Sequence, residues 1–371
     1  MIPVNEPRIG LHELEYVREC LQTGWISSEG RFIGAFEQAW ADYCGMKFGV
    51  AVSNGTTALQ LAVACLDLQP GEEVILPTFT IISCAQAITY NGGTPVLVDC
   101  DARTWCMDVG QVEAKITPRT RAIMPVHIYG HPVDMQPLWD VARRHNLIII
   151  EDAAEAHGAE YKGTRCGSLG DINCFSFYAN KIITTGEGGM VLTNNESYAN
   201  QVRSLRNLCF QKERRFYHTA LGHNFRMTNI QAALGFAQVE NIEAAILHKR
   251  WMGQEYTRRL SQIKGLQLPV EEAWAKNVYW MYGIVLEPST GTTAEEFAKR
   301  LSERGIMTRP FFLGMHEQPV FLARGLFVDE HYPVAERLAR QGLYLPSGLT
   351  LTLEQLEEVC RVVGEELKGK H

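Results

Sequence analysis

The residue with the clearest chemical potential is Lys181, in the segment FSFYANKIITTGEGGMVLT (residues 175–193). An apolar run precedes this lysine and a glycine-rich turn follows it, so burial would keep part of its amine neutral and nucleophilic. Ser176, Thr184 and Thr185 offer hydroxyls to a phosphate, and the glycines let the backbone approach a flat ligand. Because most lysines are solvated surface charges, a covalent role for Lys181 needs support from the rest of the chain.

A second candidate is Asp152, which directly follows the apolar run LIIIE (residues 147–151). A carboxylate in such a place is costly unless it has a cationic partner, and the protonated ring nitrogen of a ligand would serve. At about 3 Å and an effective dielectric near 20, such a pair is worth roughly 5 kcal/mol, enough to keep a pyridine ring protonated. A protonated ring draws electrons from the carbon beside it.

A third candidate is the sequence Gly55-Thr56-Thr57, which follows the apolar run FGVAVS and opens a helical pattern. Free amides at a helix start can hold an anion, although the helix dipole adds only about 0.3 to 1 kcal/mol. A phosphate therefore needs charge-assisted hydrogen bonds of about 1.5 to 3 kcal/mol each, for which Thr56 and Ser176 are candidates. Ordinary N-capping explains the same sequence, so the pattern is informative only together with the others.

Six motifs, in this order, resemble those of a known family. They read GWISSEGRFIGAFE, SNGTTALQLA, MPVHIYGHPVDM, IIIEDAAEAHGAEYKG, FSFYANKIITTGEGG and GHNFRMTNIQAALG. In these motifs the chain resembles the pyridoxal-phosphate sugar aminotransferases of the DegT/DnrJ/EryC1/StrS family, and most closely the branch that makes GDP-perosamine. The resemblance implies a fold-type I α/β architecture, pyridoxal 5'-phosphate as cofactor, and a homodimer with shared active sites.

The resemblance also implies roles for single residues. Lys181 would bind the cofactor covalently and move a proton, Asp152 would contact the ring nitrogen, and Glu155 would lie near the ring hydroxyl. The implied cofactor contacts are Gly55, Thr56, Ile81, Asp152, Glu155, Ser176, Lys181 and, at the neighbouring subunit's site, Asn224. Ile81 stands where the family commonly has an aromatic residue over the ring. Either Ile81 covers the ring, or Phe79 has taken that place.

Contacts with the substrate are implied more loosely, for Trp25, Ser27, Arg226, Arg309 and His316. Trp25 and Ser27 belong to a segment that the family packs at the subunit interface beside the sugar nucleotide, but a tryptophan that anchors a loop explains the same pattern. Arg309 and His316 lie in RPFFLGMHEQPVF, the loop that the family closes over the substrate. The basic residues of a nearby loop could face an anion or solvent and are left unassigned: Lys212, Arg214 and Arg215.

The expected reaction is transfer of an amino group from L-glutamate to C4 of a nucleotide-linked 4-keto-6-deoxyhexose. The best candidate is GDP-4-keto-6-deoxy-D-mannose, which would give GDP-perosamine. A related aminotransferase acting on a UDP- or dTDP-linked ketosugar would share every motif. A 3-dehydratase is disfavoured because that branch replaces the lysine by histidine. A cofactor-binding regulatory protein without turnover is the alternative from a different class.

The composition bears on other classes of protein. A chain of 371 residues that is 46% apolar can bury a large core. A net charge of −7 and the lack of a basic stripe argue against nucleic acid. Ten cysteines without metal-ligand spacing, and no signal peptide, predict a reduced cytoplasmic protein without a metal site. Residues 74–98 carry no charge but contain prolines and glycines, so we expect interior α/β structure there and no membrane helix.

The elements that must position these residues follow from the hydrophobic pattern. Apolar runs alternate with helical patterns between residues 48 and 193: FGVAVS, EVILP, PVLVD, RAIMPV, LIIIE, NCFSF and GMVLT. This alternation predicts a mostly parallel sheet wrapped by helices, with ligands beyond the carboxyl ends of the strands. Further helices are expected at 11–22, 229–262, 293–304, 331–341 and 353–367, and a strand at 277–286. We predict a large cofactor-binding domain with an N-terminal interface segment (1–245) and a smaller α/β domain (246–371).

Overall fold

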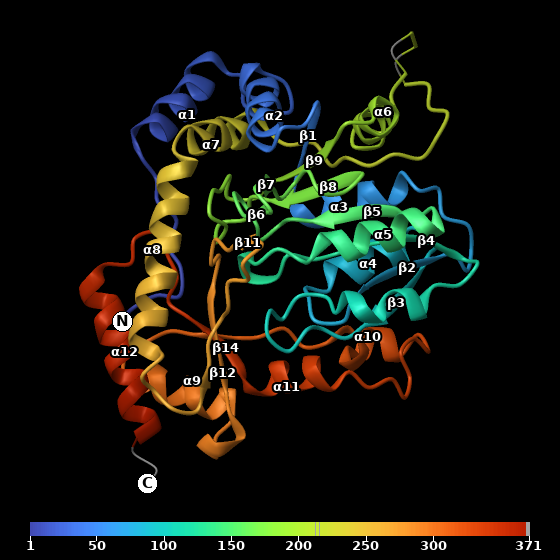
Figure 1. Ribbon diagram of the computed structural model, residues 1–371. Helices are drawn as coiled ribbons and strands as arrows, with labels where there is room; N and C mark the ends of the chain where they lie inside the picture. The colour runs from blue at the N-terminus through green and yellow to red at the C-terminus, as the bar shows by residue number, and fades with distance from the viewer. Residues whose placement is uncertain (212, 215, 369–371) are drawn as a thin grey trace.

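The computed structural model of the protein describes residues 1–211, 213–214 and 216–368, so Lys212 and Arg215 lie outside the described residues. A seven-stranded sheet forms its centre, in the order β1-β9-β8-β5-β4-β2-β3 (Figure 1). The strands are β1 (Phe48–Val52), β2 (Glu73–Pro77), β3 (Thr94–Val98), β4 (Thr120–Ile123), β5 (Ile148–Asp152), β8 (Ile172–Ser176) and β9 (Gly189–Thr193). Only β9 runs antiparallel to its neighbours, so the predicted mostly parallel sheet is confirmed.

Helices surround this sheet and continue into the C-terminal part of the chain (Figure 1). They are α1 (Leu11–Thr23), α2 (Arg31–Cys44), α3 (Gly55–Ala64), α4 (Ser83–Tyr90), α5 (Met135–His145), α6 (Glu196–Leu205), α7 (Asn229–Glu240), α8 (Ile242–Leu260), α9 (Ala294–Glu303), α10 (Pro319–Leu322), α11 (Pro333–Gln341) and α12 (Leu353–Lys368). Helices α1, α2 and α7 pack together beside β1, and α8 follows α7 and packs against α12. Among residues 1–211, 213–214 and 216–368, no helix is both long and apolar enough to cross a membrane. The uncharged segment 74–98 forms β2, α4 and β3, as expected.

Two smaller sheets complete the fold. One is antiparallel, in the order β10-β12-β14-β13, and the other joins β11 to β6 and β7. Their strands are β10 (Leu266–Gln267), β12 (Tyr282–Leu286), β13 (Arg309–Pro310), β14 (Gly342–Leu345), β11 (Ala275–Lys276), β6 (Glu160–Tyr161) and β7 (Thr164–Arg165). Buried apolar side chains form two clusters, one around the large sheet and one between α8, α9, α12 and the antiparallel sheet.

Two expected elements differ from the observed ones. The predicted helix 229–262 is wrong as a single helix, because Asn241 leaves the helical backbone conformation and separates α7 from α8. The predicted strand 277–286 begins only at Tyr282, because Tyr279 has a φ of 48° that no strand residue adopts. Helix α8 continues without interruption through residues 245 and 246, where we placed the domain boundary, and that boundary stays a prediction.

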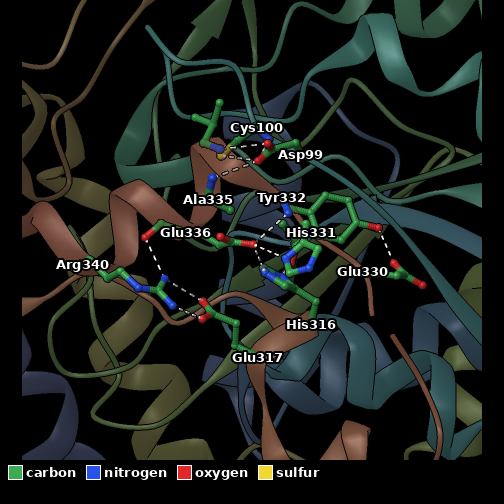
Figure 2. Close-up of polar contacts among 12 residues, drawn as sticks. Asp99, Cys100, His316, Glu317, Glu330, His331, Tyr332, Ala335, Glu336 and Arg340 are labelled. Carbon is green, nitrogen blue, oxygen red and sulfur yellow. Dashed lines mark hydrogen bonds and ion pairs between the residues drawn. The ribbon is translucent and has the colours of Figure 1, made fainter. Parts of the chain in front are cut away.

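A buried carboxylate fixes the C-terminal part of the chain to the large sheet. Asp99 follows β3, is 4% exposed, and accepts hydrogen bonds from the amides of Val334 (3.0 Å) and Ala335 (2.9 Å) at the start of α11 (Figure 2). The negative charge therefore faces the first turn of a helix, where free amides and the helix dipole favour it. Asp99 acts as a cap that is supplied from a different layer of the fold.

We expect Asp99→Ala to lower the free energy of unfolding by about 2 kcal/mol, because one buried amide and one partly buried amide lose their acceptor. Asp108→Ala is the matched control, since Asp108 caps a short 3-10 helix at the exposed amide of Gly110 (3.0 Å). Chemical denaturation of both variants at one protein concentration measures the difference. Equal losses in the two variants would contradict a special role for the Asp99 contact.

Candidate active site

A cavity of about 460 Å³ opens at the carboxyl ends of the parallel strands. The residues that end β5 and β8 and those that start α3 form its walls, together with loops that follow β2 and β4. The sequence-predicted residues that line it are Gly55, Thr56, Ile81, Asp152, Glu155, Ser176 and Lys181. The fold thus gathers side chains from five separate segments at one edge of the sheet.

Asp152 is the last residue of β5 and is only 2% exposed. Its Oδ1 accepts a hydrogen bond from the amide of Ala154 (3.0 Å), and its Oδ2 accepts one from the thiol of Cys84 (3.1 Å). Burial raises the pKa of Asp152, and these hydrogen bonds oppose that rise. None of the ion pairs between described residues includes Asp152, so the carboxylate has room for a cationic partner in the cavity.

Lys181 enters the cavity from the turn that follows β8, with its side chain 10% exposed. Its Nζ lies 3.9 Å from Oε1 of Glu155 and 3.8 Å from the centroid of the Trp280 ring. Burial lowers the pKa of Lys181, while the charges of Glu155 and Asp152 oppose that decrease. The amine therefore sits where its neutral, nucleophilic form is more accessible than in an ordinary lysine.

Glu155 completes a group of three ionisable side chains. It is 6% exposed, and its Oε2 accepts a hydrogen bond from the amide of Tyr129 (2.7 Å). Burial raises the pKa of Glu155, and the nearby Lys181 charge opposes this rise. A carboxyl group with a raised pKa gains and loses a proton more readily near neutral pH than an ordinary glutamate, which suits a residue placed beside an ionisable ligand.

The start of α3 forms the polar end of the cavity. Asn54 caps the helix by accepting a hydrogen bond from the amide of Thr57 (2.9 Å), so N-capping does occur here. The hydroxyl of Thr56 is 2.8 Å from that of Ser83, and both face the cavity together with Ser176. A Cβ atom on Gly55 would lie 2.6 Å from Cβ of Ser176, so only glycine lets β8 approach the helix start this closely. These amides and hydroxyls could hold a phosphate.

The two candidates for covering a ring lie in different surroundings. Ile81 lines the cavity and is 45% exposed. Phe79 is 1% exposed and packs against Tyr129, Phe311 and Phe312, so its ring is used in the core. The geometry favours Ile81 as the residue beside a bound ring.

Three aromatic residues of the C-terminal part close the cavity, and the sequence reasoning missed them: Trp280, Phe312 and Tyr344. Tyr129 stacks against the rings of Trp280 and Phe312 and supports both. The aromatic-rich stretches that contain Trp280 and Phe312 were visible in the sequence, but nothing local shows that they turn toward Lys181.

The N-terminal residues predicted to bind substrate lie apart from the cavity. Trp25 and Ser27 line a separate surface hollow with residues 24–29, and both side chains are exposed. Asn229 holds this loop by donating from Nδ2 to the carbonyl of Trp25 (2.7 Å). Asn224 is likewise exposed, and it accepts a hydrogen bond from Arg226 (3.1 Å) outside the cavity wall. Their roles stay predictions.

The remaining two substrate candidates differ in their access to the cavity. Arg309 is exposed on β13, directly opposite Tyr344, which lines the cavity. His316 is 5% exposed and uses both ring nitrogens, Nδ1 with the hydroxyl of Thr78 (2.8 Å) and Nε2 with Glu336 (3.3 Å; Figure 2). A substrate contact by His316 would have to replace one of these partners.

The donor set fits pyridoxal 5'-phosphate. Asp152 offers a buried carboxylate to a pyridine nitrogen, Lys181 offers an amine to an aldehyde, and the α3 start offers amides and hydroxyls to a phosphate. All three groups line one cavity of suitable size.

Comparisons with known proteins agree with this fit. Residues 7–364 match the model of the DegT/DnrJ/EryC1/StrS aminotransferase family. The GDP-perosamine synthase of Caulobacter vibrioides is 45% identical over 99% of this chain and 98% of its own. The aminotransferase TlmJ of Streptoalloteichus hindustanus has a similar structure, with a TM-score of 0.93, 31% identity and 99% coverage of both chains.

The sugar aminotransferase Spr1654 of Streptococcus pneumoniae, described as putative and solved in its pyridoxal-phosphate form, is also similar. The TM-score is 0.92 and the identity 25%, over 99% of this chain and 98% of the other. Together these matches indicate pyridoxal phosphate as the cofactor of this protein.

We expect Glu155→Gln to lower the pKa of Lys181 further, because it removes the largest of the interactions that favour the charged amine. The pH dependence of Lys181 acetylation by acetic anhydride, followed by peptide mass spectrometry on the cofactor-free protein, measures this pKa. The midpoint of the labelling profile should move to lower pH.

Glu187→Gln is the control, since Glu187 lines the same cavity and is not among the charges that shift Lys181. The interaction assigned to Glu155 and Lys181 would be wrong if both variants, or neither, moved the midpoint of the Lys181 labelling profile.

Proposed function

The chain belongs to the DegT/DnrJ/EryC1/StrS aminotransferase family and is a pyridoxal-phosphate-dependent sugar aminotransferase; from this premise we propose that it aminates C4 of GDP-4-keto-6-deoxy-D-mannose with L-glutamate, giving GDP-perosamine. The similarity to the Caulobacter vibrioides enzyme over nearly the whole of both chains supports this substrate. The observation that carries the chemistry is the position of the Lys181 amine in the same cavity as the buried carboxylate of Asp152.

The residues that would hold the cofactor divide by the chemical groups that they contact. Gly55, Thr56 and Ser176 would bind the phosphate through amides and hydroxyls. Asp152 would keep a proton on the ring nitrogen, and Glu155 would face the ring hydroxyl. When bound, pyridoxal phosphate supplies a carbonyl group that accepts and returns an amino group, and a ring that withdraws electrons from the reacting carbon.

Lys181 has two tasks in this proposal. Its amine would hold the cofactor before the reaction, and once freed its Nζ would carry a proton to and from the carbon at which the amino group is exchanged. Glu155, 3.9 Å away, adjusts the charge of that amine. The aromatic side chains that close the cavity exclude water from the Lys181 amine, which strengthens its electrostatic interaction with Glu155: Trp280, Phe312 and Tyr344.

The alternative substrate is a ketosugar linked to UDP or dTDP instead of GDP. A panel of GDP-, UDP- and dTDP-linked 4-keto-6-deoxy sugars, each incubated with enzyme, cofactor and glutamate and analysed by mass spectrometry, separates them. We expect amination of the GDP-linked sugar; exclusive amination of another nucleotide sugar would refute the proposed substrate. No conversion of cofactor by glutamate at all would favour a regulatory protein.

Lys181→Ala should lower the rate of amination by at least about a thousandfold, because the variant lacks the group that moves the proton. The variant should still fold and bind pyridoxal phosphate, since the phosphate and ring contacts lie on other residues. Lys162→Ala is the control, since Lys162 is exposed in a turn between β6 and β7. If Lys181→Ala kept most of the wild-type turnover, the assignment of the proton transfer to Lys181 would be wrong.

A homodimer in the cytoplasm is part of the proposal. Helix α1 carries apolar side chains that are exposed in the single chain, Leu11 (67%), Leu14 (59%) and Leu21 (62%), and a second subunit would cover them. The position of Asn224 outside the cavity of its own chain supports a contact with the neighbouring site. The ten buried free thiols suit a reducing compartment.

Mixing two inactive variants tests the shared site. Lys181→Ala and Asn224→Ala should each be impaired as homodimers, but a mixed dimer would contain one site with both residues intact. Random co-refolding makes about half of the dimers mixed, so activity should recover to about a quarter of wild type. If verified subunit exchange gives no gain over the average of the two homodimers, Asn224 acts within its own chain.

A further inference from the structure

Lys249 on α8 is a buried charged residue that the proposed reaction does not use. Its side chain is 1% exposed, and burial lowers its pKa to about 7. The Nζ atom donates hydrogen bonds to the carbonyls of Trp280 (2.7 Å) and Ser347. A lysine is seldom buried without a carboxylate partner. Here the hydrogen bonds to the two carbonyl groups must offset the cost of burying the amine.

One of those partners leads directly to the reactive lysine. The carbonyl of Trp280 is held by Lys249, while its indole Nε1 donates to the carbonyl of Asn180 (2.8 Å), the residue before Lys181. The indole face lies 3.8 Å from Nζ of Lys181. The Trp280 ring is therefore fixed at its backbone and at its edge, and its remaining face is turned to the amine.

The backbone before Trp280 is strained, which explains why it needs such a support. Tyr279 has a φ of 48°, in the left-handed region that a residue with a side chain seldom adopts. The ring of Tyr279 lies against Gly253 of α8, where a Cβ atom would be 2.5 Å from the ring. Helix α8 thus stabilises this turn twice, by giving space at Gly253 and by the hydrogen bond from Lys249.

We propose that Lys249 is a positioning residue of the active site, which holds the strained turn at Trp280 so that the indole ring covers the amine of Lys181. The proposal deepens the proposed function and rests on the role of Lys181 in it. Loss of the Lys249 bond would let the turn relax, and the indole would leave its place over Nζ. The amine would then become accessible to water and to small reagents.

The experiment measures access to Lys181 in the cofactor-free protein, so it does not depend on the sugar substrate. Acetic anhydride labels Lys181 across a range of pH; the plateau of the profile reports access, and the midpoint reports the pKa. Lys249→Met keeps the length and apolar stem of the side chain but removes the Nζ atom and with it both hydrogen bonds. We expect its plateau rate to rise by about fivefold or more, the factor that corresponds to roughly 1 kcal/mol of ring–amine contact. Trp280→Ala should give a similar rise.

Tyr256→Phe is the matched control. Tyr256 lies on the same helix, is fully buried, and donates to the carbonyl of Pro346 (2.9 Å), next to Ser347. This variant loses one buried hydrogen bond to the same loop but keeps the Trp280 contact. Its Lys181 labelling should match wild type even where its thermal stability falls. An unchanged plateau in folded Lys249→Met, or an equal rise in Tyr256→Phe, would overturn the proposal.

Two further measurements complete the test. If Lys249→Met does not fold, Lys249→Gln, which keeps a donor, replaces it; failure of both to fold would overturn the positioning role in favour of a structural one. In the loaded enzyme, the double variant Lys249→Met/Trp280→Ala should be no slower than Trp280→Ala alone, because Lys249 acts through the ring that both variants lack. Additive losses would contradict this, whereas absence of any amination in wild type would instead refute the proposed function.

Discussion

The burial of one amine beside two carboxylates is the interaction on which the rest of this site depends. Each of Lys181, Asp152 and Glu155 would be costly to bury alone. Burial lowers the pKa of the lysine and raises the pKa of both carboxyl groups, which favours the neutral form of each. Together they partly compensate one another, which leaves an amine that can lose its proton and carboxylates that can meet a cation. A solvated surface could not produce this balance, because water would screen the charges and restore ordinary pKa values.

The fold supplies that burial by ending several elements at one place. Parallel strands deliver Asp152 and Ser176 to the same edge of the sheet, and the start of α3 brings amides to the edge beside them. Aromatic side chains from a part of the chain about 100 residues or more after Lys181 then close the cavity. The caps on α11 and the support of Trp280 by α8 show how this second part is held against the first.

Residues with a local signature could be predicted from the sequence, and residues that depend on tertiary packing could not. The strands β2 and β9 agree with their apolar runs to the residue, because a buried strand must be apolar on both faces. Lys181 and Asp152 stood out because each interrupts an apolar context. Trp280 did not, because its approach to Lys181 follows from the backbone turn at Tyr279, which no pattern of hydrophobicity encodes. The break at Asn241 was missed because no proline or glycine near it marks the end of a helix in the sequence.

The most direct test of the account asks which lysine carries the cofactor. Reduction of the pyridoxal-phosphate-loaded protein with borohydride, proteolysis and mass spectrometry would locate the added mass on the chain. The account predicts that this mass is found on Lys181 and on no other lysine, including the buried Lys249. Cofactor mass on another lysine, or loaded protein without any covalent mass, would contradict it.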